Sequence, residues 1–154
     1  MLPLPGNRKK YLQGIFIPKN PQKYVGTGPI RYLSGWELKF FRWADNNPNV
    51  LEWASEAVII PYRSPVDGRI HSYHTDGVVA IRESNNVISK YIIEIKPSKQ
   101  TVAPVATKRK KQKTLVYENV TYAVNTAKWS AAKKWCEERE YKFLILTEKH
   151  LNIC

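Results

Sequence analysis

The sequence predicts a mixed α/β domain in which helices flank a central sheet. Apolar and aromatic residues recur at helical spacing after Ser34 and again across residues 115–139. Between these segments, residues 56–95 hold three stretches rich in β-branched and aromatic residues, and residues 141–146 form a fourth. The expected order is therefore helix, three antiparallel strands, helix and strand. That order is typical of a mixed central sheet covered by helices.

Length and composition agree with this class. The chain has 154 residues, enough for one domain with its own core, and its 43% apolar and 25% charged residues are normal for a globular protein. Cys136 and Cys154 form neither a disulfide framework nor a metal-binding spacing, which favours a reducing compartment. The proline-rich start is unlike a signal peptide, and no apolar run reaches membrane-spanning length. We therefore expect a soluble, non-secreted protein without a membrane partner.

Residues 1–33 are rich in Pro, Gly, Lys and Tyr and have no sustained period. They predict a basic, irregular N-terminal arm with one short extended piece at residues 14–17. Such an arm could lie along a DNA backbone or wrap the domain's own surface. Residues 34–154 are expected to form one domain without internal repeats, which contains a basic loop at residues 98–114.

The first helix is predicted to begin after Ser34. The sequence from Ser34 to Glu37 matches a capping box, in which the serine caps the helix and the glutamate bonds back to a free amide. Phe40 and Phe41 continue an aromatic face at helical spacing, and residues 45–48 end the helix. Glu37 therefore has a purely structural interpretation alongside any catalytic one.

The strands that follow are predicted to form a meander. They cover residues 56–63, residues 69–74 with a continuation at 78–81, and residues 87–95. Turns are expected at residues 64–68 and 84–86, and a break or bulge at Asp76-Gly77.

The formal net charge of +12 is concentrated in two flanks. Residues 1–30 carry five basic and no acidic side chains, residues 97–154 carry twelve basic and five acidic ones, and the centre is neutral. This distribution favours a nucleic-acid partner, because phosphates neutralised by Lys or Arg release counterions. A merely solvated surface and an anionic membrane surface are the alternatives.

Several side chains are candidates for contacting phosphates. They are Lys108, Arg109, Lys110, Lys111 and Lys113 of the basic loop, together with Gln100 and Lys128 beside the expected site. Each could equally be a solvated side chain, and basic runs can also serve as nuclear-import signals.

A glutamate and a lysine end the last strand of the meander. Side chains alternate along a strand, so Glu94 and Lys96 share one face while Ile93 and Ile95 point to the other. The pair could form a plain ion pair. If the strands pair as expected, Asp76 converges on Glu94 at one edge of the sheet, and two carboxylates near a lysine are costly unless a cation intervenes.

Carboxylate oxygens in such an arrangement suit Mg²⁺ or Mn²⁺ with several waters retained. The ion would polarise a phosphate oxygen and lower the pKa of a bound water, and Lys96 would orient that water or stabilise the transition state. His71 and His74 point to opposite faces of their predicted strand, which argues against a zinc pair. No Gly-rich phosphate loop, Ser-His-Asp set or CxxC pair offers another chemistry.

Asp76 and Glu94-Ile95-Lys96 resemble the residue set of the PD-(D/E)xK nucleases. This resemblance implies a restriction-endonuclease-like core and metal-dependent hydrolysis of DNA phosphodiesters. Asp76 and Glu94 would bind the metal, and Lys96 would serve the water. In several branches of that superfamily a glutamate on the first helix completes the metal site, and Glu37 matches its position.

Six longer segments resemble the head completion nucleases of tailed bacteriophages with contractile tails. They are Ser34-Gly35-Trp36-Glu37-Leu38-Lys39, Asn47-Pro48-Asn49-Val50-Leu51-Glu52-Trp53, Ile60-Pro61-Tyr62, Ser64-Pro65-Val66-Asp67-Gly68, Ile93-Glu94-Ile95-Lys96-Pro97 and Ala127-Lys128-Trp129. The resemblance implies a virion protein, also present in the cytoplasm of the infected host, that cuts or trims packaged double-stranded DNA with little sequence specificity. Phage head or portal proteins would be its neighbours. A homodimer would suit double-strand cutting, although the sequence shows no dimer surface.

One departure from this family concerns the turn at Asp76. The family's usual Pro-Asp-aromatic is replaced by Thr75-Asp76-Gly77, so we expect the carboxylate to be kept but supported less firmly. This leaves open a non-catalytic DNA-binding plug or adaptor with a decayed nuclease fold. A resolvase selective for branched DNA is a further alternative that would share the same site.

Overall fold

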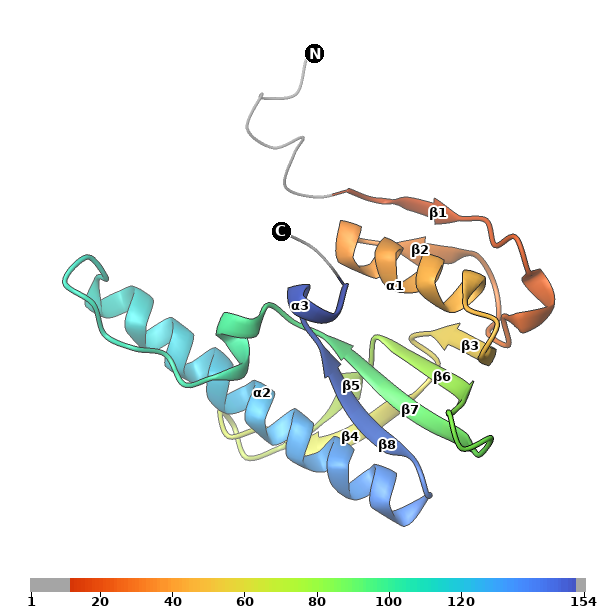
Figure 1. Cartoon of the computed structure of the whole chain (residues 1–154). Coiled ribbons are helices and arrows are strands. Elements are labelled where there is room, and N and C mark those ends of the chain that lie inside the picture. The colour runs from red at the N-terminus through yellow and green to blue at the C-terminus, as the bar shows by residue number, and fades with distance from the viewer. Residues whose placement is uncertain (1–11, 152–154) are drawn as a thin grey trace.

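The computed structural model describes residues 12–151. Its elements are β1 (Gly14–Phe16), the 3-10 turn η1 (Pro21–Lys23), β2 (Ile30–Tyr32), α1 (Gly35–Asn46), β3 (Val50–Ser55), β4 (Ile59–Arg63), β5 (Ile70–His74), β6 (Gly77–Arg82), β7 (Ile88–Ile95), the 3-10 turn η2 (Ser98–Thr101), α2 (Gln112–Glu138), β8 (Lys142–Leu146) and α3 (Glu148–Leu151). Figure 1 shows α1 on one side of the central sheet and α2 on the other.

The central sheet has four strands in the order β3-β6-β7-β8. β3, β6 and β7 pair antiparallel, and β8 pairs parallel to β7. A parallel neighbour requires a crossover connection, which α2 provides. The predicted class, a mixed central sheet with flanking helices, is confirmed.

The identity of the antiparallel strands differs from the prediction. β3 was not expected, yet it forms one edge of the sheet, whereas β4 and β5 form a separate two-stranded sheet. A register shift between Val50 and Glu52 interrupts the regular pairing of β3, and burial of Trp53 and Ala54 in succession hides the two-residue period. The break predicted at Asp76-Gly77 is present, but the meander prediction was wrong in placing the segments on its two sides in one sheet.

α1 begins as the capping box predicts. The Ser34 hydroxyl accepts a hydrogen bond from the Glu37 amide at 3.1 Å, and Glu37 Oε1 accepts one from the Leu33 amide at 3.3 Å. The buried face of α1 places Phe40 and Phe41 against Trp53, and all three side chains are fully buried. This first core joins α1 to one face of the sheet.

A second core lies between α2 and the β4–β5 hairpin. Trp129 and Ala132 of α2 pack with Ile60, Tyr62 and Tyr73 of the hairpin. The N-terminal half of α2 and the chain before it project away from the sheet (Figure 1). Within residues 12–151, none of the helices combines the length and apolar character of a membrane span.

The described part of the predicted N-terminal arm packs on the first core. β1 pairs antiparallel with β2, and Phe16, Tyr24 and Ile30 contact that core. Asp45 fixes the connection by accepting hydrogen bonds from the Lys19 and Asn20 amides. Residues 12–33 therefore wrap the domain's own surface, one of the two alternatives left open. Residues 1–11 lie outside the described part, and the domain boundary at residue 33 stays a prediction.

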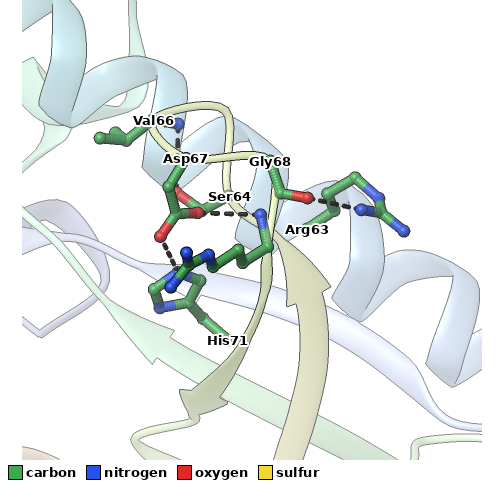
Figure 2. A network of polar contacts seen from close by, with 7 residues as sticks. Arg63, Ser64, Val66, Asp67, Gly68 and His71 are labelled. Atoms are coloured by element: carbon green, nitrogen blue, oxygen red, sulfur yellow. Dashed lines mark hydrogen bonds and ion pairs between the residues drawn. The ribbon is translucent and has the colours of Figure 1, made fainter.

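The turn between β4 and β5 provides a partner for His71, one of the two histidines considered as metal ligands in the sequence. Asp67 accepts a hydrogen bond from the Arg69 amide at 2.9 Å and contacts His71 Nε2 at 2.8 Å. Figure 2 shows the Asp67 and His71 side chains meeting beside this turn. His71 is thus engaged with the turn, on an exposed part of the hairpin. His74, at the end of β5, is also exposed.

Candidate active site

Glu94 and Lys96 lie together at the end of β7. Glu94 is 5% exposed, and Lys96 Nζ lies 3.4 Å from Glu94 Oε1. The neighbouring Ile93 and Ile95 pack with the first core, on the opposite face of the sheet. The prediction that the glutamate and lysine share a face is confirmed, and the two side chains form an ion pair.

Asp76 joins this pair from the connection between β5 and β6. Its amide donates to the Ile93 carbonyl at 3.0 Å, and its Oδ2 accepts from the Ile95 amide at 2.7 Å. These two bonds hold the residue against the end of β7. The predicted convergence of Asp76 on the strand of Glu94 is therefore present in the fold.

The electrostatics of Asp76 reflect a crowded group of carboxylates. Burial raises the pKa of Asp76 to about 7, and the negative charge of Glu94 adds to that rise. The hydrogen bond from the Ile95 amide lowers this pKa. The charge of Glu37 raises it further, and the charge of Lys96 lowers it. Two carboxylates in this position are costly to ionise together, so the site favours a proton or a cation beside Asp76.

The turn around Asp76 is held by contacts of Thr75 and Gly77. Thr75 is fully buried, and its hydroxyl donates to the Val58 carbonyl at 2.8 Å. A Cβ on Gly77 would lie 2.6 Å from Phe40 Cε2, so the α1 aromatic ring occupies the space of a side chain. The hydroxyl of Thr75 and the close packing of Gly77 both constrain the turn, and its support relative to a Pro-Asp-aromatic turn stays a prediction.

Glu37 lies near this group, close enough for its charge to raise the pKa of Asp76. It lines a hollow of about 450 Å³ together with Asp76, Ile95 and Pro97, and burial is the main reason its pKa is raised. Its Oε1 contacts both Leu33 N and the Ser34 hydroxyl in the cap of α1. Across residues 12–151, no three His, Cys, Asp or Glu side chains gather closely enough to hold a metal. The ligand role of Glu37 stays a prediction.

The residues present fit a hard divalent cation that keeps several waters. Asp76 Oδ1 accepts no hydrogen bond from the described residues, and Glu94 Oε1 faces Lys96 rather than a backbone donor. The atoms that would bind the metal are all carboxylate oxygens, which Mg²⁺ and Mn²⁺ prefer as ligands. A cation would also offset the repulsion that raises the pKa of Asp76.

Sequence reasoning missed Tyr73. This residue of β5 is 3% exposed, and its hydroxyl donates to Glu94 Oε2. Burial and the charge of Glu94 raise the pKa of Tyr73, so the hydroxyl keeps its proton. Nothing in the local pattern indicates this contact, because β5 and β7 belong to different sheets.

The candidate phosphate-contacting residues fall into three groups. Lys108, Arg109, Lys111 and Lys113 are exposed, and so is Gln100. Lys110 instead pairs with Glu118 at 2.8 Å. Lys128 Nζ lies over the rings of Tyr62 and Tyr73, 5.8 Å and 5.6 Å from their centroids. Lys128 is therefore next to the tyrosine that contacts Glu94. Their contacts with DNA stay predictions.

The raised pKa of Asp76 predicts that the metal-free protein loses stability as pH rises. An unfolded aspartate titrates near pH 4, so between about pH 4 and about pH 7 the folded protein binds more protons than the unfolded chain. The stability that protonated Asp76 contributes is fully present below the pKa of the unfolded chain, and it is lost as pH rises through the pKa of the folded protein. Thermal unfolding in EDTA should show it as a midpoint that falls with pH relative to Asp76→Asn. Parallel pH profiles of the two proteins would contradict a raised pKa at Asp76.

Comparison with known proteins identifies the family of the chain. Residues 47–148 match the family of TnsA-like endonuclease N-terminal domains, and the chain belongs to this family. The match includes Asp76, Glu94 and Lys96, whereas Glu37 precedes it.

A curated relative extends the comparison to nearly the whole chain. The head completion nuclease of Enterobacteria phage T4 is 40% identical over 144 residues, covering 90% of this chain and 92% of the relative. The resemblance to head completion nucleases is therefore confirmed.

Proposed function

We propose that this protein is a metal-dependent DNA endonuclease whose active site is formed by Asp76, Glu94 and Lys96. The carrying observation is that Asp76 and Glu94 lie close enough for the charge of one to raise the pKa of the other, with the Lys96 ammonium beside them. Membership of an endonuclease family gives this cluster its chemical interpretation.

Each residue has a distinct task in this proposal. Asp76 Oδ1 and Glu94 Oε1 would hold Mg²⁺ or Mn²⁺, which supplies Lewis-acid polarisation of a phosphate oxygen and a more acidic water. Lys96 donates to a water or to a non-bridging phosphate oxygen and offsets negative charge in the transition state. Glu37 is proposed to complete the shell of the metal, since it lines the same hollow as Asp76.

The exposed cations near the projecting end of α2 would bind the DNA backbone. Phosphate contacts fix the position of a duplex and carry no base information, so we expect little sequence specificity. Gln100 and Lys128 would contact phosphates closer to the site.

Removing the exposed cations is expected to weaken DNA binding without disabling the active site. For Lys108→Ala/Arg109→Ala/Lys111→Ala, the slope of log K against log salt should fall by about 0.9 for each lost phosphate contact. Fluorescence anisotropy with duplex DNA over a salt series measures this slope. Lys133→Ala/Lys134→Ala, exposed near the other end of α2, is the control, and the change in slope is compared per charge removed. Equal slopes for both variants would remove the loop from the DNA-binding surface.

The proposed biological setting comes from the phage relative. We propose a virion protein that acts on packaged double-stranded DNA during head completion, next to head or portal proteins and in the cytoplasm of the infected host before release. A homodimer would place one active site on each of the two strands of the DNA duplex.

The non-catalytic plug remains the alternative, and the contacts of Thr75 and Gly77 around Asp76 favour the nuclease over it. The branched-DNA resolvase shares the same site and differs in substrate. Comparing cleavage of linear duplexes and four-way junctions separates it from the proposed activity.

The proposed function is tested by incubating supercoiled plasmid with the purified protein and Mg²⁺, Mn²⁺ or EDTA. Nicked and linear products are expected with either metal and absent with EDTA. DNA binding without cleavage under every condition would instead support the plug.

A further inference from the structure

The contact between Tyr73 and Glu94 joins two separate sheets. Tyr73 belongs to the β4–β5 hairpin, whereas Glu94 belongs to β7 of the central sheet. The tyrosine hydroxyl donates to Glu94 Oε2, and both side chains are buried. A buried carboxylate needs partners for both oxygens, so this bond is one of the conditions for placing Glu94 in the core.

The two oxygens of Glu94 have different surroundings. Oε2 is taken by Tyr73, and Oε1 lies 3.4 Å from Lys96 Nζ. The terminal torsion of a glutamate is intrinsically broad, so packing of the side chain alone does not select one carboxylate orientation. A fixed donor at Oε2 does select it, and it leaves Oε1 on the side of Lys96.

The donor itself is held rigidly. Tyr73 pairs with Ile60 across the hairpin and packs in the second core with Trp129 and Ala132. Lys128 Nζ lies 5.6 Å from the centroid of its ring. The hydroxyl is therefore carried by the β4–β5 hairpin, which packs on α2 and on Phe143 and Ile145 of β8.

We propose that Tyr73 is a positioning residue of the nuclease: by occupying Oε2 of Glu94, it presents Oε1 to the divalent cation beside Lys96. This inference rests on the proposed function. Partners that orient a metal-ligating carboxylate typically contribute about 10–100-fold to metal affinity or activity.

Tyr73→Phe tests the proposal because it removes the hydroxyl and keeps the ring. The dissociation constant for Mn²⁺, measured by electron paramagnetic resonance of free Mn²⁺, should rise about 10–100-fold. The Mg²⁺ concentration that gives half-maximal plasmid nicking should rise in parallel, with a smaller loss of rate at saturating Mg²⁺.

Tyr62→Phe is the matched control. Tyr62 is buried in the same hairpin, its ring lies 5.8 Å from Lys128 Nζ, and its hydroxyl makes no hydrogen bond within the described residues. This variant should bind Mn²⁺ with wild-type affinity. Thermal unfolding of both variants shows that each is folded at the assay temperature.

A double-mutant cycle separates positioning from general damage. In a Glu94→Gln background, Tyr73→Phe should cause no further loss of Mn²⁺ affinity, whereas independent structural damage would add to the loss. Wild-type Mn²⁺ affinity in Tyr73→Phe, or additive losses in the cycle, overturns the inference and leaves the proposed function standing. A wild-type protein that neither binds Mn²⁺ nor nicks DNA overturns both.

Discussion

Glu94→Gln is expected to lower DNA cleavage by about 10³-fold or more while DNA affinity stays close to that of the wild type. The substitution keeps the volume of the side chain but replaces a charged oxygen that faces Lys96 and the proposed cation with a neutral amide. DNA affinity comes from exposed cations elsewhere, which the substitution does not touch. Single-turnover nicking and anisotropy on the same preparation measure the two properties.

Glu83→Gln provides a close control for Glu94→Gln. Glu83 also accepts a hydrogen bond from a tyrosine, Tyr91, but lies beyond the end of β6 that is distant from Asp76. Its substitution should leave cleavage at the wild-type level. Undiminished cutting by a folded Glu94→Gln protein would contradict the assignment of this residue to the active site.

Gly77→Ala is expected to destabilise the protein by about 1–3 kcal/mol and to lower cleavage strongly. The new Cβ would lie 2.6 Å from Phe40 Cε2 and 3.4 Å from the Ala54 carbonyl oxygen. Phe40 is fully buried, so its ring cannot move into solvent to relieve the clash. The Phe40 ring or the backbone beside Asp76 must then shift, and we expect the backbone to move because the ring is fully buried. A shift of about 1 Å in a reacting group can cost about 10²-fold in rate. Chemical denaturation and nicking assays measure the two effects.

Phe40→Leu offers a test of the mechanism behind that loss. The shorter side chain removes the ring atoms nearest to the new Cβ, so the double variant Phe40→Leu/Gly77→Ala should be more stable than the sum of the single losses predicts. Strict additivity, or a Gly77→Ala protein as stable and active as the wild type, would show that the packing at Gly77 does not support Asp76.

Local rules were sufficient for part of this fold. The capping box placed the start of α1 at Ser34, and the two-residue period of a strand placed Glu94 and Lys96 on one face. Both inferences depend on contacts between residues a few positions apart, which the order of side chains determines directly.

Features that depend on distant contacts were not accessible in the same way. The register shift in β3 concealed an edge strand, and the separation of the β4–β5 hairpin from the central sheet concealed the bond from Tyr73 to Glu94. The role of Gly77 is visible only once Phe40 of α1 is placed against it. In each case, the deciding neighbour comes from another element of the fold.

The most direct test of the central claim is an anomalous difference map from a crystal of the protein soaked in Mn²⁺. The proposed active site predicts a peak beside the carboxylates of Asp76 and Glu94, near Lys96. Absence of that peak at a Mn²⁺ concentration that supports DNA cleavage, or a single peak elsewhere on the protein, would contradict it.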